Sequence, residues 1–148
     1  MIKVSEEIEK VAKENGIDLI AIKKEEAEEI LNCIQQKYIK NQKTSFWWDG
    51  LKDFSAINDK EGWSYIKDFI GNSCCLLFFN SFDDKAVLKL NSGMDLHKIL
   101  CETFGFEFYL TNMGTQYFIC FNHHDCLLGC GTAKEWVNEL KMREEVCL

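Results

Sequence analysis

The sequence predicts one α+β domain over residues 1–148, in which N-terminal helices precede a mainly antiparallel sheet packed with helices. Apolar residues in the first third recur at spacings of three and four, which is the period of a helix with one buried face. In the second half, apolar runs are separated by turns too short for a parallel crossover, so paired strands there must be antiparallel. The 148 residues include 11 Phe and 4 Trp, ample material for a single core.

The first 22 residues predict a helix followed by an extended segment. Ser5 suits the N-cap position, and Glu6 and Glu7 complement the positive end of the helix dipole in the first turn. Asn15–Gly16 is a common C-terminal stop. The apolar, β-branched sequence at 17–22 then indicates a short strand or an extended connection.

A second helix is predicted from Glu25 onward. Its apolar face consists of Ala27, Ile30, Leu31, Ile34 and Tyr38. The first turns also carry four acidic residues, Glu25, Glu26, Glu28 and Glu29. The simplest interpretation of these glutamates is a solvated helix face, because charged side chains normally occupy the side of a helix that faces water.

The middle of the chain is irregular and aromatic. Its large rings are Phe46, Trp47, Trp48, Phe54 and Trp63. Some of them are expected to cover the core, and any that are exposed together would mark a binding surface. The sequence at 59–71 then indicates a short helix that ends at Gly71.

The second half predicts the order ββαββ(β)α. The expected elements are antiparallel strands at 74–79 and 86–90, a helix at 94–104, a hairpin of 106–112 with 116–122, and a further strand at 126–129. Thr132 and Glu135 form a capping box for the last helix. That helix is expected to turn Trp136, Val137 and Leu140 inward.

Charge and cysteine usage exclude several classes of protein. The chain has 17 basic and 24 acidic residues, a net charge of −7, and Arg143 is its one arginine. Nucleic-acid binding and attachment to an anionic membrane both require a basic face, so neither is expected. No apolar run approaches the length of a membrane span. Eight cysteines within apolar runs, after a charged N-terminus, indicate free thiols in a reducing cytoplasm.

The densest chemistry lies at 120–136, "CFNHHDCLLGCGTAKEW". A zinc ion could take His123, His124, Cys126 and Cys130 as ligands. Their spacing fits poorly, because all four lie in one short stretch and adjacent histidines on an extended chain point to opposite sides. A polar turn of Asn122, His123, His124 and Asp125 is the simpler interpretation, with one histidine bound to a backbone carbonyl and Asp125 accepting backbone amides.

A cysteine nucleophile is the second chemical interpretation of this stretch. Cys130 lies just before a predicted helix, where the dipole would lower the thiol pKa. His123 or His124 could act as its base, and Asp125 or Asn122 could orient that base. The residue types are suitable, but the sequence does not show that they meet.

The sequences "FEFYLTN", "QYFICFNHHDCLLGCG" and "TAKEW", with the aromatic "FWWDGL", resemble a group of small uncharacterised bacterial α+β proteins that share an Asn-His-His-Asp turn. The resemblance covers residues 46–140. Proteins of this kind are similar to immunity proteins of contact-dependent inhibition and polymorphic-toxin systems. That resemblance implies a cytoplasmic protein that binds and blocks a toxin's catalytic domain.

The function expected from the sequence is therefore a non-catalytic toxin inhibitor, acting as a monomer or homodimer and needing no cofactor. Its partner would be a cognate toxin domain, and a basic nuclease would match the acidic charge. The expected binding patch is Trp47, Trp48, Asp49 and Asp53, with Glu25, Glu26, Glu28 and Glu29 as second choice. The alternative is a small cysteine- or metal-dependent enzyme built on 120–130, and a scaffold or self-associating domain is a third possibility.

Overall fold

The computed structural model describes residues 2–103 and 105–146 and confirms the α+β class. The helices are α1 (Val4–Glu14), α2 (Lys24–Tyr38), α3 (Ile66–Ile70), α4 (Gly93–Glu102) and α5 (Thr132–Val146). The strands are β1 (Leu19–Ala21), β2 (Phe54–Asn58), β3 (Cys75–Phe78), β4 (Val87–Leu90), β5 (Phe108–Thr111), β6 (Tyr117–Phe121) and β7 (Cys126–Gly131). Short 3₁₀ turns occupy Trp47–Asp49 and Gly62–Tyr65.

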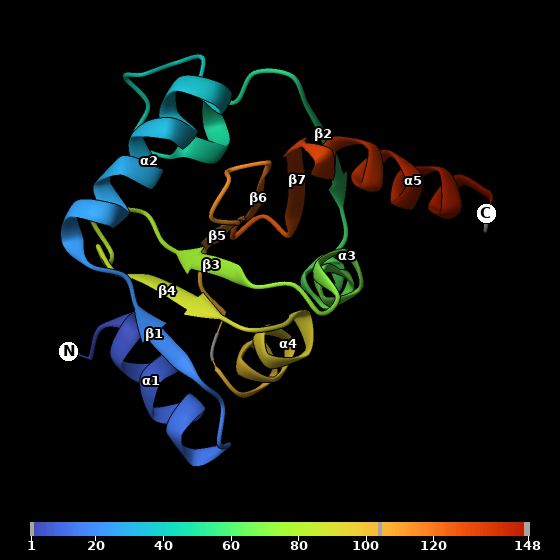
Figure 1. Cartoon of the computed structure of the whole chain (residues 1–148). Coiled ribbons are helices and arrows are strands. Elements are labelled where there is room, and N and C mark those ends of the chain that lie inside the picture. The colour runs from blue at the N-terminus through green and yellow to red at the C-terminus, as the bar shows by residue number, and fades with distance from the viewer. Residues whose placement is uncertain (1, 104, 147–148) are drawn as a thin grey trace.

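The described strands form one antiparallel sheet in the order β1-β4-β3-β5-β6-β7-β2 (Figure 1). The two predicted pairs are confirmed, because β3 pairs with β4 and β5 pairs with β6, both antiparallel. The predicted extra strand is β7, which pairs with β6. The expected helix at 94–104 is α4, and residue 104 lies outside the described residues.

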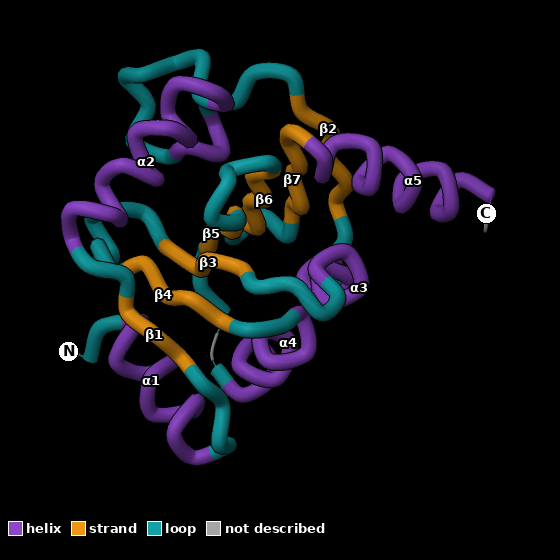
Figure 2. Tube along the Cα trace, in the orientation of Figure 1, coloured by secondary structure: helices purple, strands orange, loops and turns teal. Residues whose placement is uncertain are grey.

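Helices cover both faces of this sheet (Figure 2). Buried side chains of α1, α3, α4 and α5 form a core on one face, and those of α2 with the segment 39–51 form a second core on the other. Alternate residues of β3 enter opposite cores: Cys75 and Leu77 the first, Leu76 and Phe78 the second. A strand buried on both faces reads as a continuous apolar run, as 75–78 does.

The start of α1 differs from the prediction. The N-cap position belongs to Lys3, whose side chain makes no capping bond, and Ser5 lies buried inside the helix. The Ser5 N–H donates to Asp84 Oδ2 at 2.9 Å, so a carboxylate 79 residues away satisfies it. A tertiary contact has replaced the local cap that the sequence favoured.

The predicted irregular segment contains a strand that the sequence analysis missed. Residues of β2 pair along their whole length with β7, from Phe54 opposite Cys130 to Asn58 opposite Cys126. Ile57 is buried against the first core, while Phe54 is exposed. The strand is weakly marked in the sequence because it lies at the sheet edge, where one neighbouring strand supplies the pairing.

The described helices include none with the length and apolar composition that a bilayer span requires. Seven cysteines lie within the described residues, all as free thiols, and Cys147 lies outside them. Cys74 is exposed and Cys75 is buried, because adjacent side chains on extended chain point to opposite sides.

Candidate functional site

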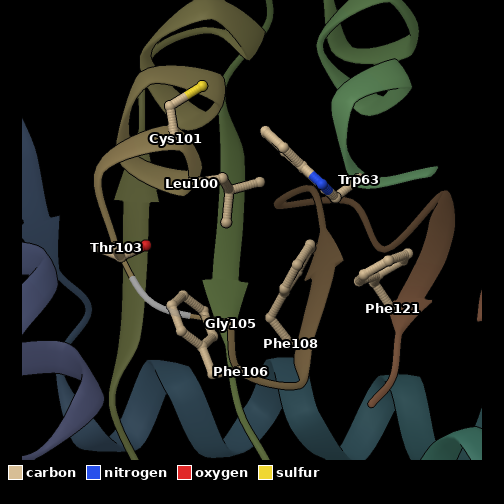
Figure 3. A pocket seen from close by; sticks show the side chains of 8 residues that line it. All are labelled: Trp63, Leu100, Cys101, Thr103, Gly105, Phe106, Phe108 and Phe121. Atoms are coloured by element: carbon tan, nitrogen blue, oxygen red, sulfur yellow. The ribbon is translucent and has the colours of Figure 1, made fainter. Parts of the chain in front are cut away.

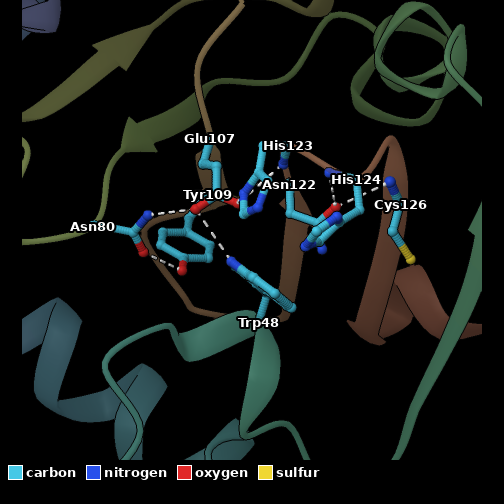
Figure 4. A network of polar contacts seen from close by, with 8 residues as sticks. All are labelled: Trp48, Asn80, Glu107, Tyr109, Asn122, His123, His124 and Cys126. Atoms are coloured by element: carbon cyan, nitrogen blue, oxygen red, sulfur yellow. Dashed lines mark hydrogen bonds and ion pairs between the residues drawn. The ribbon is translucent and has the colours of Figure 1, made fainter.

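Four segments distant in sequence meet around the carboxylate of Glu107, just before β5 (Figure 4). Its Oε1 accepts hydrogen bonds from Asn80 Nδ2 at 2.8 Å and from Trp48 Nε1 at 3.2 Å. Its Oε2 accepts from the backbone N–H of His123 at 3.0 Å and lies 2.5 Å from His123 Nδ1. We call Glu107, Trp48, Asn80, Tyr109 and His123 the Glu107 network.

The electrostatics of Glu107 favour its ionised form. Its side chain is 9% exposed, and burial by itself would raise the pKa. Hydrogen bonds from His123, Asn80 and Trp48 outweigh burial and hold the pKa of Glu107 below its usual range. Because both oxygens already accept two donors each, this carboxylate positions other side chains and is poorly placed to take a proton from a substrate.

The Glu107 network is anchored in the second core. The Tyr109 hydroxyl donates to Asn80 Oδ1 at 2.5 Å, and burial raises the pKa of Tyr109 well above its usual value. The Tyr109 ring lies 5.3 Å from that of Phe118, which is fully buried. Polar groups at the surface are thus fixed to a packed interior.

The predicted turn is organised by Asn122, not by Asp125. Asn122 is buried, and its Oδ1 accepts from the backbone N–H groups of His124 at 3.0 Å and Cys126 at 3.1 Å. Asp125 is exposed and adopts φ 59°, a left-handed conformation that Asp tolerates. The expected carbonyl partner of a histidine ring is instead the Glu107 carboxylate, which holds His123.

The two histidine rings lie together, contrary to the expectation that they point to opposite sides. Their centroids are 3.9 Å apart at an interplanar angle of 45°. The expectation was wrong because the backbone at 122–125 turns, whereas alternation of side chains requires extended chain. The Trp48 ring packs nearly perpendicular to both, with its centroid 6.0 Å from that of His123 and 5.8 Å from that of His124.

Two phenylalanines extend these rings into an aromatic surface. The ring centroid of Phe46 lies 5.4 Å from that of Trp48 and 5.4 Å from that of Phe82. The Phe82 residue is 61% exposed. We call this surface the aromatic cluster; its members are Phe46, Trp48, Phe82, His123 and His124. It joins the segments before β2, after β3 and between β6 and β7.

Acidic residues accompany the aromatic cluster. An exposed aspartate follows directly in sequence after three of its members, at Asp49, Asp83 and Asp125. Three separate segments therefore each bring an aromatic ring and an aspartate to the same region. An apolar centre bordered by carboxylates is the arrangement expected of a surface that meets a cationic partner.

The residues of the binding patch predicted from the sequence lie in different parts of the structure. Trp48 and Asp49 lie at the aromatic cluster, but Trp47 packs inward, with its ring 6.1 Å from Phe118 and 6.2 Å from Tyr109. Asp53 lies just before β2, and Lys134 Nζ lies 2.5 Å from its carboxylate oxygen Oδ1. The second-choice residues all lie exposed on α2: Glu25, Glu26, Glu28 and Glu29.

Burial disfavours the thiolate form of the cysteines at positions 126 and 130. Cys130 is fully buried in β7, and burial raises its pKa to about 12, so the expected lowering by a helix dipole was wrong. Burial also raises the pKa of Cys126, which is half-buried. Nowhere in residues 2–103 and 105–146 do three or more His, Cys, Asp or Glu side chains form a group able to hold a metal ion.

An apolar pocket of about 350 Å³ lies elsewhere, between α4 and the sheet (Figure 3). Its described lining is Trp63, Leu100, Cys101, Thr103, Gly105, Phe106, Phe108 and Phe121. The Thr103 hydroxyl donates to the Ile99 carbonyl at 2.9 Å. The described lining therefore offers mainly apolar contacts, together with the Cys101 thiol and the Thr103 hydroxyl.

Comparison with protein-family models, with curated proteins and with solved structures finds no match for this chain. Sequence analysis missed Glu107, Asn80 and Phe82. A lone glutamate inside the apolar run 106–110 was the available signal for Glu107, whereas nothing local marks Phe82.

Proposed function

We propose that this chain is a non-catalytic cytoplasmic protein that binds a cognate bacterial toxin domain and neutralises it by occluding its active site. The observation that carries the proposal is the aromatic cluster. It exposes Phe82 and His123 beside half-buried Trp48 and Phe46. Large rings grouped at one surface are typical of the residues that contribute most to binding between proteins.

Rigidity supports a binding role for this surface. Trp48 is fixed through its indole N–H and His123 through its backbone and ring, all by the buried Glu107. Side chains already held in one geometry lose little conformational entropy on association. The Glu107 network would therefore present a preformed surface to the partner.

Charge supports a basic partner. The chain carries a net charge of −7, and an exposed aspartate follows Trp48, Phe82 and His124 in the sequence. Complementary charge accelerates encounter and disfavours incorrect partners. A toxin that acts on nucleic acid needs a basic active site, and an acidic inhibitor would cover the surface that phosphates otherwise occupy.

The alternative, an enzyme built on 120–130, requires a thiol that ionises near neutral pH or a complete metal shell. Burial raises the pKa of both Cys126 and Cys130, which opposes nucleophilic chemistry at either sulfur. These raised pKa values therefore favour binding over thiol chemistry at residues 120–130.

The test first asks whether a neighbouring gene encodes a large secreted protein with a variable C-terminal domain, and then measures binding of that domain to this chain. Trp48→Ala and Phe82→Ala should each weaken its binding by about tenfold or more, as expected for central aromatic contacts. Phe54→Ala is the matched control, because Phe54 is 44% exposed on β2, outside the aromatic cluster. Equal losses of binding in all three variants would contradict the assignment of the aromatic cluster as the binding surface. Failure of the neighbouring domain to bind this chain, or to be inhibited by it, would contradict the proposed function.

A further inference from the structure

Strand β1 forms one edge of the sheet, with β4 on one side and no described strand on the other (Figure 1). The Ile22 N–H donates to the Val87 carbonyl at 2.9 Å, so the backbone groups of Ile22 point toward β4. Backbone groups alternate in direction along an antiparallel strand. The N–H and C=O groups of Leu19 and Ala21 therefore point away from β4. Within the described part of the chain, no turn or loop hydrogen bond uses either N–H.

The side chains at this edge are apolar and accessible. Ile20 is 57% exposed, and Ala21 beside it is also exposed. Helices α1 and α2, which precede and follow β1, pack into opposite cores and leave the edge between them open. Free backbone groups beside an exposed β-branched side chain favour pairing with a further strand.

We propose that this edge binds a second copy of the chain, with β1 antiparallel to β1 of that copy about a twofold axis at Ala21. The direction of the backbone groups permits this register. Ala21 exchanges two backbone hydrogen bonds with its own copy, and Leu19 lies opposite Lys23. Ile20 then lies opposite Ile22 of the copy, on the face of the sheet that carries α2.

Charge complementarity selects this partner and this register. Asp18 of each copy lies beside Lys23 and Lys24 of the other, and all three residues are exposed. Opposite charges on paired strands stabilise the pairing. A twofold axis at Ile20 would instead place Asp18 opposite the apolar Ile22. The edge is thus complementary to itself, as a symmetric contact between two copies requires.

Sedimentation equilibrium of the wild-type protein tests this inference. A contact confined to one edge strand is small, so we expect a reversible monomer–dimer equilibrium that depends on protein concentration. Ala21→Pro removes the N–H that bonds the copy, and Ile20→Lys places a charge opposite an apolar side chain. Each should weaken dimerisation by about tenfold or more. Phe54→Lys is the matched control, because Phe54 is an exposed apolar residue of β2 at the opposite sheet edge. It should leave dimerisation unchanged.

An exchange of charges tests the register. Asp18→Lys and Lys24→Asp should each weaken dimerisation by about threefold or more, as expected for exposed ion pairs that occur twice in a symmetric contact. The double variant should recover most of this loss, since opposite charges again face each other. A double variant that dimerises no better than either single variant would contradict the register.

Three outcomes would overturn the proposed contact. The first is a folded wild-type protein that stays monomeric up to about 1 mM. The second is dimerisation that Ala21→Pro and Ile20→Lys leave unchanged. The third is dimerisation that Phe82→Ala abolishes, which would place the contact at the aromatic cluster. Circular dichroism verifies folding, and Ile20→Lys still tests the edge if Ala21→Pro does not fold. The measurement uses this chain alone, so its result is independent of the proposed function.

Discussion

Glu107 shows how one residue can determine the shape of a surface while exposing little of itself. Its carboxylate collects donors from Trp48, Asn80 and His123, which belong to three different segments. The same bonds hold its pKa below the usual range against the effect of burial. The residue therefore links local electrostatics to the position of two rings of the aromatic cluster.

A pH-dependent loss of stability follows from the lowered pKa of Glu107. Its contribution is fully present above the ordinary glutamate pKa of about 4.3 and is lost as pH falls through the lower folded value. Glu107→Gln should be less stable than wild type at pH 7 and should lose less stability on acidification. Urea unfolding at a series of pH values measures both effects. Glu26→Gln, on the exposed face of α2, controls for the loss of one negative charge.

Gly129 of β7 is required for the approach of α5. A Cβ at this position would lie 2.7 Å from the Ala133 carbonyl oxygen and 2.7 Å from Val137 Cγ2. Gly129→Ala should therefore lower the free energy of unfolding by about 1–3 kcal/mol, the usual cost of overpacking. Denaturant unfolding tests this. Gly114→Ala is the control, because its Cβ would meet only ordinary contacts from 3.6 Å outward, and equal stabilities would contradict the prediction.

At the scale of elements, distant segments complete what local sequence leaves open. The N-terminal turn of α1 depends on Asp84, which accepts the Ser5 N–H and, through its other oxygen, the Ala86 N–H at 3.0 Å. Burial alone would raise the pKa of Asp84, but these bonds lower it overall. The helix and the loop after β3 therefore stabilise each other.

Replacement of this cap should destabilise the protein measurably. We expect Asp84→Ala to reduce the free energy of unfolding by about 1–2 kcal/mol and to accelerate hydrogen exchange in α1. The neighbouring Asp83 is exposed, and Asp83→Ala should change stability by less than about 0.5 kcal/mol. Indistinguishable exchange rates in α1 of the two variants would show that the cap is not needed.

For the whole molecule, burial sorts the thiols by reactivity. Cys74 and Cys101 are exposed, whereas Cys75, Cys120 and Cys130 are buried with pKa values raised by burial. Iodoacetamide labelling followed by mass spectrometry should modify the first two rapidly and the other three only after unfolding. Rapid modification of Cys130 in the folded protein would instead revive the cysteine-enzyme alternative.

The success of the fold prediction depended on how strongly each element was marked. Helices α2 and α5 and the strands β3 to β7 carry clear apolar patterns, and the structure contains each of these elements where the pattern predicted it. Strand β2 was missed because its pairing comes from β7, about 70 residues later. The Ser5 cap was wrong because Asp84, equally distant in sequence, satisfies that amide. Such contacts leave no local pattern.

The sequence by itself determined the class of fold, the acidic character and the stretch 120–126 that carries the histidines. Only the tertiary structure decided that Trp48 and His123 share a buried Glu107, that Trp47 points inward, and that Phe82 joins the exposed rings. Periodicity and composition indicate which side chains avoid water. Which distant residues meet at one site depends instead on the order of strands in the sheet. That order is set by long-range pairing, which a local pattern does not encode.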